Sequence, residues 1–455
     1  MTSRFAKTRR DKLVEGPVLP AIWTMAYPMI VTMGLQSLFN IVDIYFVGKL
    51  GSDAVAAVGM SGIIMFFMMT LMIGLGTATR ALIARFIGSN RFDSASEIAS
   101  SSLIIAFIIS VLAGVFGTTL APQILVALGA DKTVLTFGVQ YIQIMFIGMM
   151  SLAFTASINS ILQGAGDAKT PMFILLFSVG LNIFLDPMLI LGIGPFPKLG
   201  VRGAAIATVS ARGIAMIIGM FLILRGINHF KLSLKSLRWN GSRIWQVVKI
   251  GFPAAIQPAM NNIAGLIMIR IVSGFSMEAV AAFVVAMRIN MFALLPGFGL
   301  GNANGTIVGQ NLGAGRPARA KRSTWITCGI LEIVLITIGA VFYIFAPWII
   351  TKFNDNPEVV RIGVVGLRTL TLGYPILAIA TILARAINGA GVTKIPAIIL
   401  AIAFFAVQVP LAVVLSRTTM EVTGVFVAVI IGFFVQAVIF SWYFLSNRWA
   451  KAHFS

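Results

Sequence analysis

Apolar runs of bilayer-spanning length fill almost the whole chain and limit what it can fold into. Of its 455 residues, 58% are hydrophobic and only 11% are charged, whereas a soluble globular domain carries about 25% charged residues. A membrane-spanning helix needs about 20 apolar residues. Runs broken by glycine, proline and charge predict twelve spans, near residues 19–48, 54–79, 94–119, 134–160, 170–192, 201–225, 244–273, 279–308, 320–347, 358–386, 395–416 and 422–446. We therefore expect an all-α membrane protein.

Basic side chains are divided unevenly between the two sets of loops. The chain has 34 Lys plus Arg against 14 Asp plus Glu. Of the basic residues, 23 lie in the two terminal segments and alternate loops, and 8 lie in the remaining loops. Lys and Arg collect on the cytoplasmic side of membrane proteins. We therefore expect a multi-pass protein of the cell membrane with both termini in the cytoplasm, and no nucleic-acid partner.

An internal repeat divides the chain into halves. The sequence aligns with itself at a fixed offset of 225 residues, so that Pro28 aligns with Pro253 and Lys169 aligns with Lys394. Six spans are an even number, so both copies enter the membrane from the same side, as parallel repeats about an axis along the membrane normal. The predicted segments are a cytoplasmic N-terminal segment at 1–18, a first six-helix lobe at 19–228, a basic cytoplasmic linker at 229–243, a second lobe at 244–446 and a cytoplasmic tail at 447–455. Such a duplication favours a transporter that works by alternating access.

Two intramembrane acids lie where the halves differ. Asp43 aligns with Met268, and Asp186 aligns with Leu411. Each acid belongs to a polar stripe on one helix face: Gln36, Asn40 and Asp43 on the first span, and Ser178, Asn182 and Asp186 on the fifth. An ionised side chain inside a membrane costs several kcal/mol unless it is paired or hydrated. Two interpretations remain open: a titrating proton or cation site, and a structural pair held by Arg212 and by amides.

Other polar residues inside the spans have less specific interpretations. Glu332 is a third intramembrane acid, and either pairs with Arg270 or Arg288 or takes part in coupling. Asn159 and Thr208 line a substrate cleft, or bond helix to helix as small polar residues do in membranes. Pro28 removes a backbone hydrogen bond early in the first span, so it is either a shared structural bend or a moving hinge.

Cysteine and histidine usage excludes several kinds of site. Cys328 is the single cysteine, and His229 and His453 are the only histidines, so an internal disulfide, a cysteine cage or a His-rich metal site is not expected. The sequence GAGD at 164–167 fits a motif of intramembrane aspartyl proteases, but the second copy keeps the glycines and has Val392 in place of the acid. That pattern is typical of a turn. We expect no catalytic residue and no cofactor, and we expect that the protein is not an enzyme.

The segments FNIVDIYFVGKLGSDAVAAVGM, GLGTATRALIARFIGSNR, ILQGAGDAKTPM and GLNIFLDPMLILGIG, followed by LGVRGAAIAT, resemble the multidrug and toxic compound extrusion (MATE) transporters over essentially the whole chain. The resemblance implies a V-shaped pair of six-helix lobes that exports cationic or amphiphilic compounds in exchange for protons or sodium. Within this family, part of the superfamily that also contains lipid flippases, the chain is most similar to the DinF branch, including archaeal members. It departs from the NorM branch, because two of its spans contain no acid. These are the seventh span, GFPAAIQPAMNNIAGLIMI, and the tenth span, LRTLTLGYPILAIATIL.

By the same resemblance, Asp43, Asp186 and Asn182 bind the coupling ion, either a proton or a sodium ion, and no other metal is implied. Gln36, Asn40, Asn159 and Thr208 are the expected substrate-cleft residues. The expected partners are drug-like substrates and membrane lipids, and the expected state is a monomer.

A flippase for lipid-linked sugars is the alternative within the superfamily. A flippase that handles polyphosphate headgroups needs cationic side chains in its cleft. Only Arg212, Arg270 and Arg288 are basic residues well inside spans, so their placement distinguishes the two functions.

Overall fold

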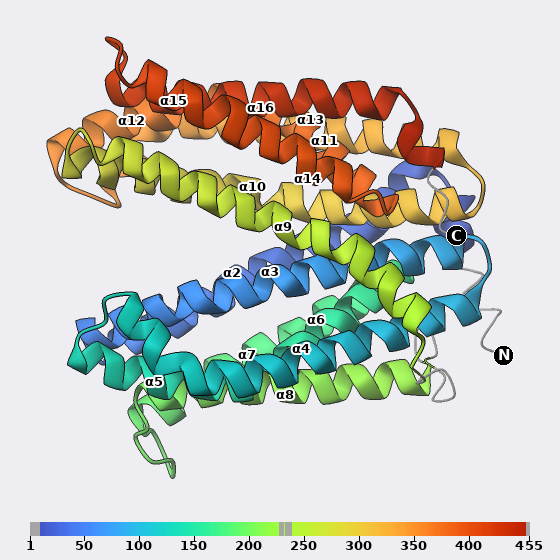
Figure 1. The fold of residues 1–455 in the computed structure, drawn as a ribbon, viewed down its shortest axis with the longest axis horizontal. Helices are drawn as coiled ribbons and strands as arrows, with labels where there is room; N and C mark the ends of the chain where they lie inside the picture. Colours follow the sequence, from blue (N-terminus) through green and yellow to red (C-terminus); the bar gives the residue numbers. More distant parts are fainter. Residues whose placement is uncertain (1–9, 227–231, 233–238, 452–455) are drawn as a thin grey trace. The chain divides into compact units, whose positions relative to one another are not determined.

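The computed structural model describes residues 10–226, 232 and 239–451. Within these residues, ten helices are long and apolar enough to span a membrane, and two further bent pairs bring the number to twelve if each pair is one span (Figure 1). The all-α class and the twelve predicted spans are thereby confirmed. Helices dominate because a backbone in lipid must satisfy its own hydrogen bonds. The predicted linker at 229–243 falls largely on residues 229–231 and 233–238, which lie outside the described residues.

The helices follow the predicted order. The first half of the chain contains α2 (Val18–Gly48), α3 (Ser52–Gly88), α4 (Phe92–Ala127), α5 (Lys132–Ile147), α6 (Met149–Gly164), α7 (Lys169–Leu191) and α8 (Val201–Arg225). The second half contains α9 (Gly241–Val272), α10 (Met277–Gly313), α11 (Pro317–Thr351), α12 (Pro357–Leu372), α13 (Tyr374–Gly389), α14 (Lys394–Ala401), the π-helix η3 (Ile402–Gln408), α15 (Val409–Leu415), α16 (Glu421–Leu445) and the 3₁₀ helix η4 (Arg448–Lys451).

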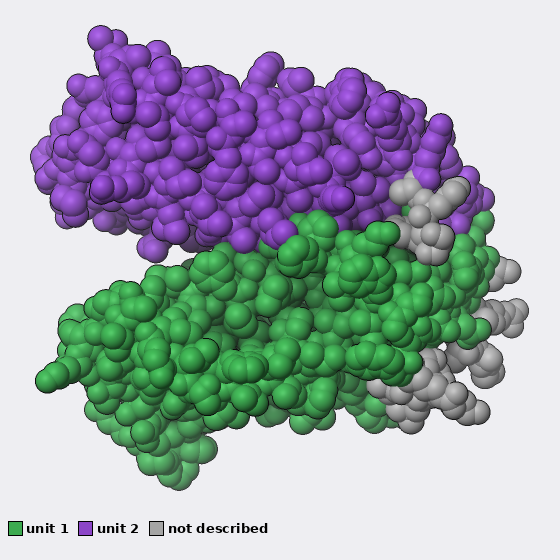
Figure 2. Space-filling view, viewed as in Figure 1, with its two compact units in different colours: residues 1–16, 31–255 green, residues 17–30, 256–455 purple. Residues whose placement is uncertain are grey.

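The chain divides into two compact units that exchange the beginnings of their first helices. Unit 1 comprises residues 1–16 and 31–255, and unit 2 comprises residues 17–30 and 256–455 (Figure 2). The first part of α2 therefore packs within unit 2, and the first part of α9 packs within unit 1. Each unit is completed by a helix segment from the other half of the sequence.

Equivalent glycines allow this close packing. A Cβ on Gly74 would lie 2.5 Å from the Cβ of Ala255, and a Cβ on Gly299 would lie 2.8 Å from the Cα of Ile30. Gly74 and Gly299 occupy equivalent positions of the repeat, as do Ile30 and Ala255. Because a side chain at either glycine would meet a neighbouring helix, glycine is required where each exchanged segment joins its unit.

The two units repeat the same helix packing. In unit 1, α3 packs against α4, α5 and α6, and α8 packs against α7. In unit 2, α10 packs in the same way against α11, α12 and α13, and α16 packs against η3 and α15. The turns repeat as well: Gly166 and its equivalent in the second half, Gly391, have φ values of 88° and 83°.

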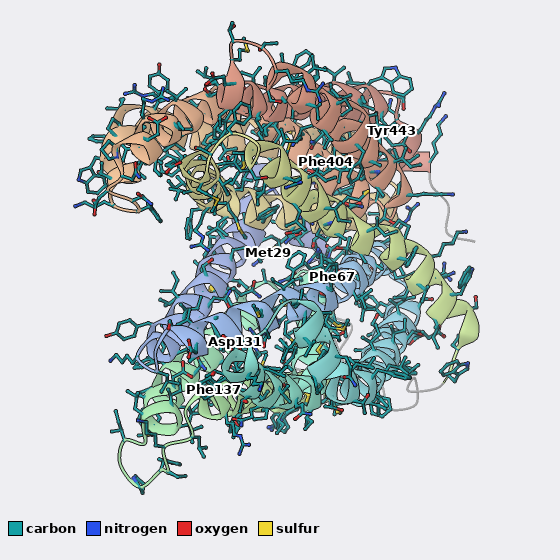
Figure 3. All side chains as sticks on the ribbon, turned by 60° about the vertical axis from the view of Figure 1, so that its left-hand side comes forward. Met29, Phe67, Asp131, Phe137, Phe404 and Tyr443 are labelled. Atoms are coloured by element: carbon teal, nitrogen blue, oxygen red, sulfur yellow. The ribbon has the colours of Figure 1, made fainter. Side chains whose placement is uncertain are left out.

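Two spans are broken at equivalent glycines, which the sequence did not predict. The helices α5 and α6 meet at Gly148 with a bend of 48°, and α12 and α13 meet at Gly373 with a bend of 56°. A Cβ on Gly148 would overlap the side chain of Val209 in α8, at 2.2 Å. Packing against another helix therefore fixes the break. At the other end of α5, Asp131, labelled in Figure 3, caps the helix by accepting a hydrogen bond from the Val134 amide at 2.8 Å.

Candidate functional site

The two acids predicted from the sequence meet inside unit 1. Asp43 lies on the part of α2 that belongs to unit 1, and Asp186 lies on α7. Their carboxyl groups contact each other. Thr208 of α8 donates a hydrogen bond to Asp43 Oδ2 at 3.1 Å, and Asn182 Nδ2 donates to Asp186 Oδ1 at 3.1 Å. Three helices thus supply one polar cluster, the acid site, made of these four residues.

Three of the four residues of the acid site are buried, and Asp43 is partly exposed. Asp186 and Asn182 are fully buried and Thr208 is 3% exposed. Within the described part of the chain, Asp186 Oδ2, Asn182 Oδ1 and the hydroxyl of Ser178 make no hydrogen bond. A buried polar atom without a partner costs about 1–3 kcal/mol. Two ionised carboxylates in contact also repel each other, and a proton or another cation at the site relieves that repulsion.

Arg212 stands beside the acid site without forming an ion pair with it. Its guanidinium lies 4.8 Å from the centre of the Phe39 ring, and it acts on Asp43 through space. Its Nε is buried and has no hydrogen-bond partner among the described residues. Phe39 in turn packs against Leu175 and Val179 of α7. The structural alternative, in which Arg212 holds one acid by a direct ion pair, is therefore not what this geometry shows.

Tyr141 also lies near the acid site, and it was not predicted from the sequence. It lies on α5, is 7% exposed, and is within electrostatic reach of both acids and Arg212. The repeat contained a signal for it, because the two halves differ at this position: the equivalent of Tyr141 in the second half is Gly366. A Cβ at Gly366 would overlap the Phe426 ring, so that position is needed for packing in unit 2.

The predicted substrate-cleft residues divide into two groups. Thr208 joins the acid site directly, as described above. Gln36 and Asn40 are exposed on α2, and no contact joins either to the acid site among the described residues. Asn159 of α6 is partly buried, and its Oδ1 has no hydrogen-bond partner there. A cleft role for these three side chains stays a prediction, as does a hinge at Pro28, which lies inside the continuous helix α2.

Two other acids named in the sequence analysis have different outcomes. Glu332 is partly buried and forms no ion pair with Arg270 or Arg288 among the described residues, so the predicted pairing is wrong. Asp167 follows the glycines of the predicted turn and is 1% exposed. It accepts hydrogen bonds from the Lys169 and Thr170 amides and from the Thr170 hydroxyl, at 3.1, 3.1 and 2.7 Å. The glycine-rich turn thus positions a capping acid for α7.

Comparison with known proteins agrees with this architecture. The MatE family model matches residues 28–188 and again residues 253–414. The chain is 28% identical to the probable multidrug resistance protein YoeA of Bacillus subtilis, over 96% of this chain and 97% of that protein. It is 25% identical to a FAD transporter of Shewanella oneidensis (83% and 84% covered) and 26% identical to the probable multidrug resistance protein NorM of Thermotoga maritima (94% and 92% covered).

Solved structures show the same fold. A crystal structure of MATE in the bent conformation superposes with a TM-score of 0.91 at 24% identity, covering 97% of this chain and 98% of that chain. An outward-facing multidrug resistance MATE family transporter superposes with a TM-score of 0.90, at the same identity and coverage.

Proposed function

The chain belongs to the MatE family of multidrug and toxic compound extrusion transporters, and on this premise we propose that it is a secondary active antiporter exporting cationic or amphiphilic compounds. Two of the relatives above are named as probable multidrug resistance proteins. The observation that carries the proposal is the contact between Asp43 and Asp186 inside unit 1. Intramembrane acids of this kind mark proton relays and ion pathways.

The acid site is proposed to couple export to ion entry by changing its charge. When both acids are ionised, the site attracts a cationic substrate. When a proton enters from the outer medium, the pair loses its mutual repulsion and one of its two negative charges, and the remaining charge stands beside Arg212, so the substrate is released outward. Loss of the proton to the cytoplasm restores the negative site. Because the two carboxyl groups are in contact, they are expected to titrate as a coupled pair rather than independently.

We take a proton as the coupling ion because Thr208 and Asn182 each direct a hydrogen-bond donor at a carboxylate. Sodium is the alternative. Asp186 Oδ2, Asn182 Oδ1 and the Ser178 hydroxyl make no hydrogen bond among the described residues, and a hard cation takes oxygen ligands of this kind. The two imposed gradients below distinguish the two ions.

Transport in proteoliposomes tests the proposal. Efflux of a fluorescent cation is followed first under an imposed pH gradient and then under an imposed sodium gradient. We expect export with the pH gradient alone, and loss of export in Asp43→Asn. Asp53→Asn is the matched control, because Asp53 is exposed at the start of α3. Wild-type export in Asp43→Asn at equal expression contradicts the coupling site.

Two further substrate probes distinguish the antiporter from the flippase. FAD is included because one relative is named as a FAD transporter, and a fluorescent lipid-linked sugar tests the flippase alternative. Gradient-dependent export of the cation alone supports the antiporter proposed here. Movement of the lipid-linked sugar without movement of the cation supports the flippase.

The proposed orientation places both termini in the cytoplasm of a cell-membrane protein. It rests on the excess of Lys and Arg in the terminal segments and alternate loops. A monomer is proposed as the working unit, since the acid site is formed by helices of a single chain.

A further inference from the structure

Arg212 places a positive charge inside a span of unit 1, next to the acid site. It lies on α8, one helical turn after Thr208. Its guanidinium carbon lies 4.8 Å from the centre of the Phe39 ring, and its Nε is buried without a hydrogen-bond partner among the described residues. Asp43 is within its electrostatic reach. Arginine stays protonated in proteins, so a fixed cation stands beside the two acids.

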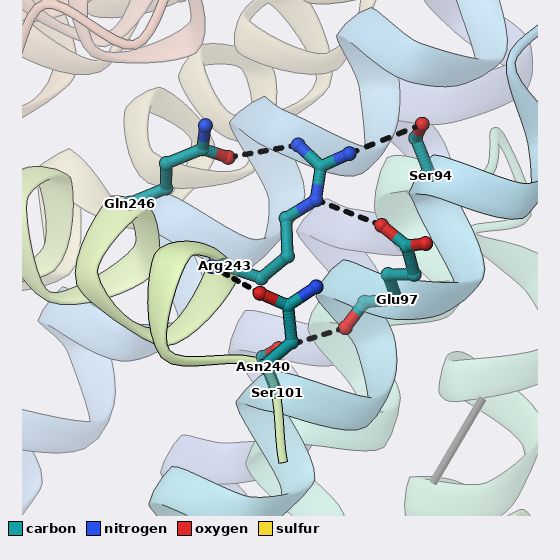
Figure 4. Close-up of polar contacts among 6 residues, drawn as sticks. All are labelled: Ser94, Glu97, Ser101, Asn240, Arg243 and Gln246. Atoms are coloured by element: carbon teal, nitrogen blue, oxygen red, sulfur yellow. Dashed lines mark hydrogen bonds and ion pairs between the residues drawn. The ribbon is translucent and has the colours of Figure 1, made fainter. Parts of the chain in front are cut away.

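Another arginine of unit 1 has the opposite arrangement. Arg243 donates to Glu97 Oε2 at 2.8 Å and to Ser94 Oγ at 3.3 Å (Figure 4). Arg243 and Glu97 therefore neutralise each other within one ion pair. Arg212 forms no ion pair among the described residues and acts on Asp43 through space. It lowers the negative charge of the acid site without occupying either carboxylate.

Four members of this group have apolar equivalents in unit 2. The offset of 225 residues aligns Asp43 with Met268 and Phe39 with Ala264. On the last long helix of each unit, where Gly203 aligns with Gly424, the equivalents of Thr208 and Arg212 are Val429 and Phe433. All four equivalents are buried, and Met268, Val429 and Phe433 belong to one hydrophobic cluster. The acid, the cation and its aromatic neighbour are thus replaced together, as expected for residues that act as one group.

Two acids and one base set the charge of the site among the described residues. Asp43 and Asp186 contribute two negative charges when both are ionised, and Arg212 contributes one positive charge. Tyr141, within reach of all three, is a phenol and is neutral near pH 7. No third acid of the described chain joins the pair. The sum is one net negative charge, which a single proton or a single monovalent cation cancels.

We propose that Arg212 determines the specificity of the acid site for monovalent organic cations. The inference rests on the function proposed above and names the charge of the substrate. With Arg212 present, a dication leaves a surplus positive charge inside a span, which is costly. With Arg212 replaced by a neutral side chain, the two ionised acids match a dication instead. Arg212 also lets one proton complete the discharge of the site, because no net charge then remains to hold the substrate.

Binding of two related dyes tests the inference. Ethidium carries one positive charge and propidium carries two, on the same phenanthridinium ring system. Their dissociation constants are measured by fluorescence for the full-length protein in detergent, at an alkaline pH at which both acids are ionised. We expect the wild type to prefer ethidium, and Arg212→Met to shift the ratio of the two constants toward propidium by about tenfold or more.

Two variants control for the substitution itself. Arg212→Lys keeps the charge and should keep the wild-type ratio. Arg202→Met removes an arginine that is exposed at the start of the same helix, so it should also keep that ratio. If Arg212→Met does not fold, Arg212→Gln gives the same comparison, because it removes the charge and keeps a polar side chain.

Two further readouts separate a charge effect from a structural one. Without the neighbouring cation the acids take up a proton more readily, so Arg212→Met should lose ethidium binding at a pH about one unit higher than the wild type does. Asp43→Asn leaves no net charge and should lose ethidium binding. Combining it with Arg212→Met restores one net negative charge, so the double variant should regain that binding. A purely structural role for Arg212 predicts neither the pH shift nor the recovery.

Failure of this inference is distinguishable from failure of the proposed function. If Asp43→Asn weakens ethidium binding, but Arg212→Met changes neither the ratio of the constants nor the pH of half-binding, the acid site stands and the role of Arg212 is wrong. If the wild type binds neither dye, or if Asp43→Asn binds ethidium as the wild type does, both are overturned.

Discussion

The ion pair between Arg243 and Glu97 is expected to anchor the exchanged start of α9 to unit 1, and a double-mutant cycle measures this. The side chains of Arg243 and Glu97 are 17% and 40% exposed, with Arg243 Nε 2.8 Å from Glu97 Oε2. The guanidinium also lies 5.1 Å from the centre of the Phe86 ring. The perturbations are Glu97→Gln, Arg243→Gln and the two together.

The magnitude follows from the partial burial. A fully exposed ion pair contributes about 0.2–1 kcal/mol, and a hydrogen bond to a charged group contributes about 1.5–3 kcal/mol. Glu97 retains 40% exposure, so water screens the pair and lowers its contribution toward the first range. We expect a coupling free energy of about 1 kcal/mol, measured by denaturant unfolding of the four proteins in detergent.

A second pair in the same chain is the control. Arg361 and Glu358 are 2.6 Å apart, but their side chains are 68% and 48% exposed. Their coupling free energy should be smaller than that of Arg243 and Glu97, because solvent screens exposed pairs three residues apart on a helix. If both cycles give the same value, or if the effects of Glu97→Gln and Arg243→Gln are simply additive, the anchoring role is refuted.

Three further predictions concern the acid site, the helix packing and the orientation. Thr208→Val should slow export about tenfold or more, because it removes a hydroxyl donor to a carboxylate, while Thr208→Ser should retain the wild-type rate in the same efflux assay. Gly389→Val should destabilise unit 2 by about 2 kcal/mol or more, since a Cβ at this position would overlap the backbone of Gly305; unchanged unfolding in detergent would refute that contact. Ser242→Cys should resist an impermeant thiol reagent in intact cells and Asp355→Cys should react, both residues being exposed; the opposite pattern reverses the orientation.

The spans could be predicted because each depends on a local property of the sequence. A run of apolar residues predicts a membrane helix without knowledge of its neighbours, and the predicted bounds 201–225 match α8. The breaks at Gly148 and Gly373 depend on long-range packing. Gly148 lies against Val209, which belongs to a different span, and no local pattern distinguishes it from other glycines in spans.

The exchange of helix segments between the units also could not be predicted from the sequence. The repeat predicts that residues 19–48 and 244–273 have equivalent environments, but equivalence alone does not say which half each segment packs against. That choice depends on contacts such as those of Gly74 and Gly299 with the exchanged segments. The partition between the units therefore depends on long-range packing that the repeat alone does not specify.

The acids of the site were predictable because burial of charge in a membrane is costly and hence informative. Asp43 and Asp186 interrupt apolar helices in one half of the repeat only, and the structure brings them together. Tyr141 was missed because a tyrosine is only weakly polar and does not stand out within a span. The pairing of Glu332 with Arg270 or Arg288, one of two roles expected for it, rested on charge alone, and charge does not fix the side-chain direction on which an ion pair depends.

Proton release on substrate binding tests the central claim, that Asp43 and Asp186 exchange protons for substrate. Purified protein in weakly buffered detergent solution is mixed with a saturating cationic substrate, and the pH is recorded. The account predicts proton release that follows substrate occupancy in the wild type and in Asp53→Asn, and that is lost in Asp43→Asn and in Asp186→Asn. Wild-type proton release in both of these variants, with substrate still bound, would contradict it.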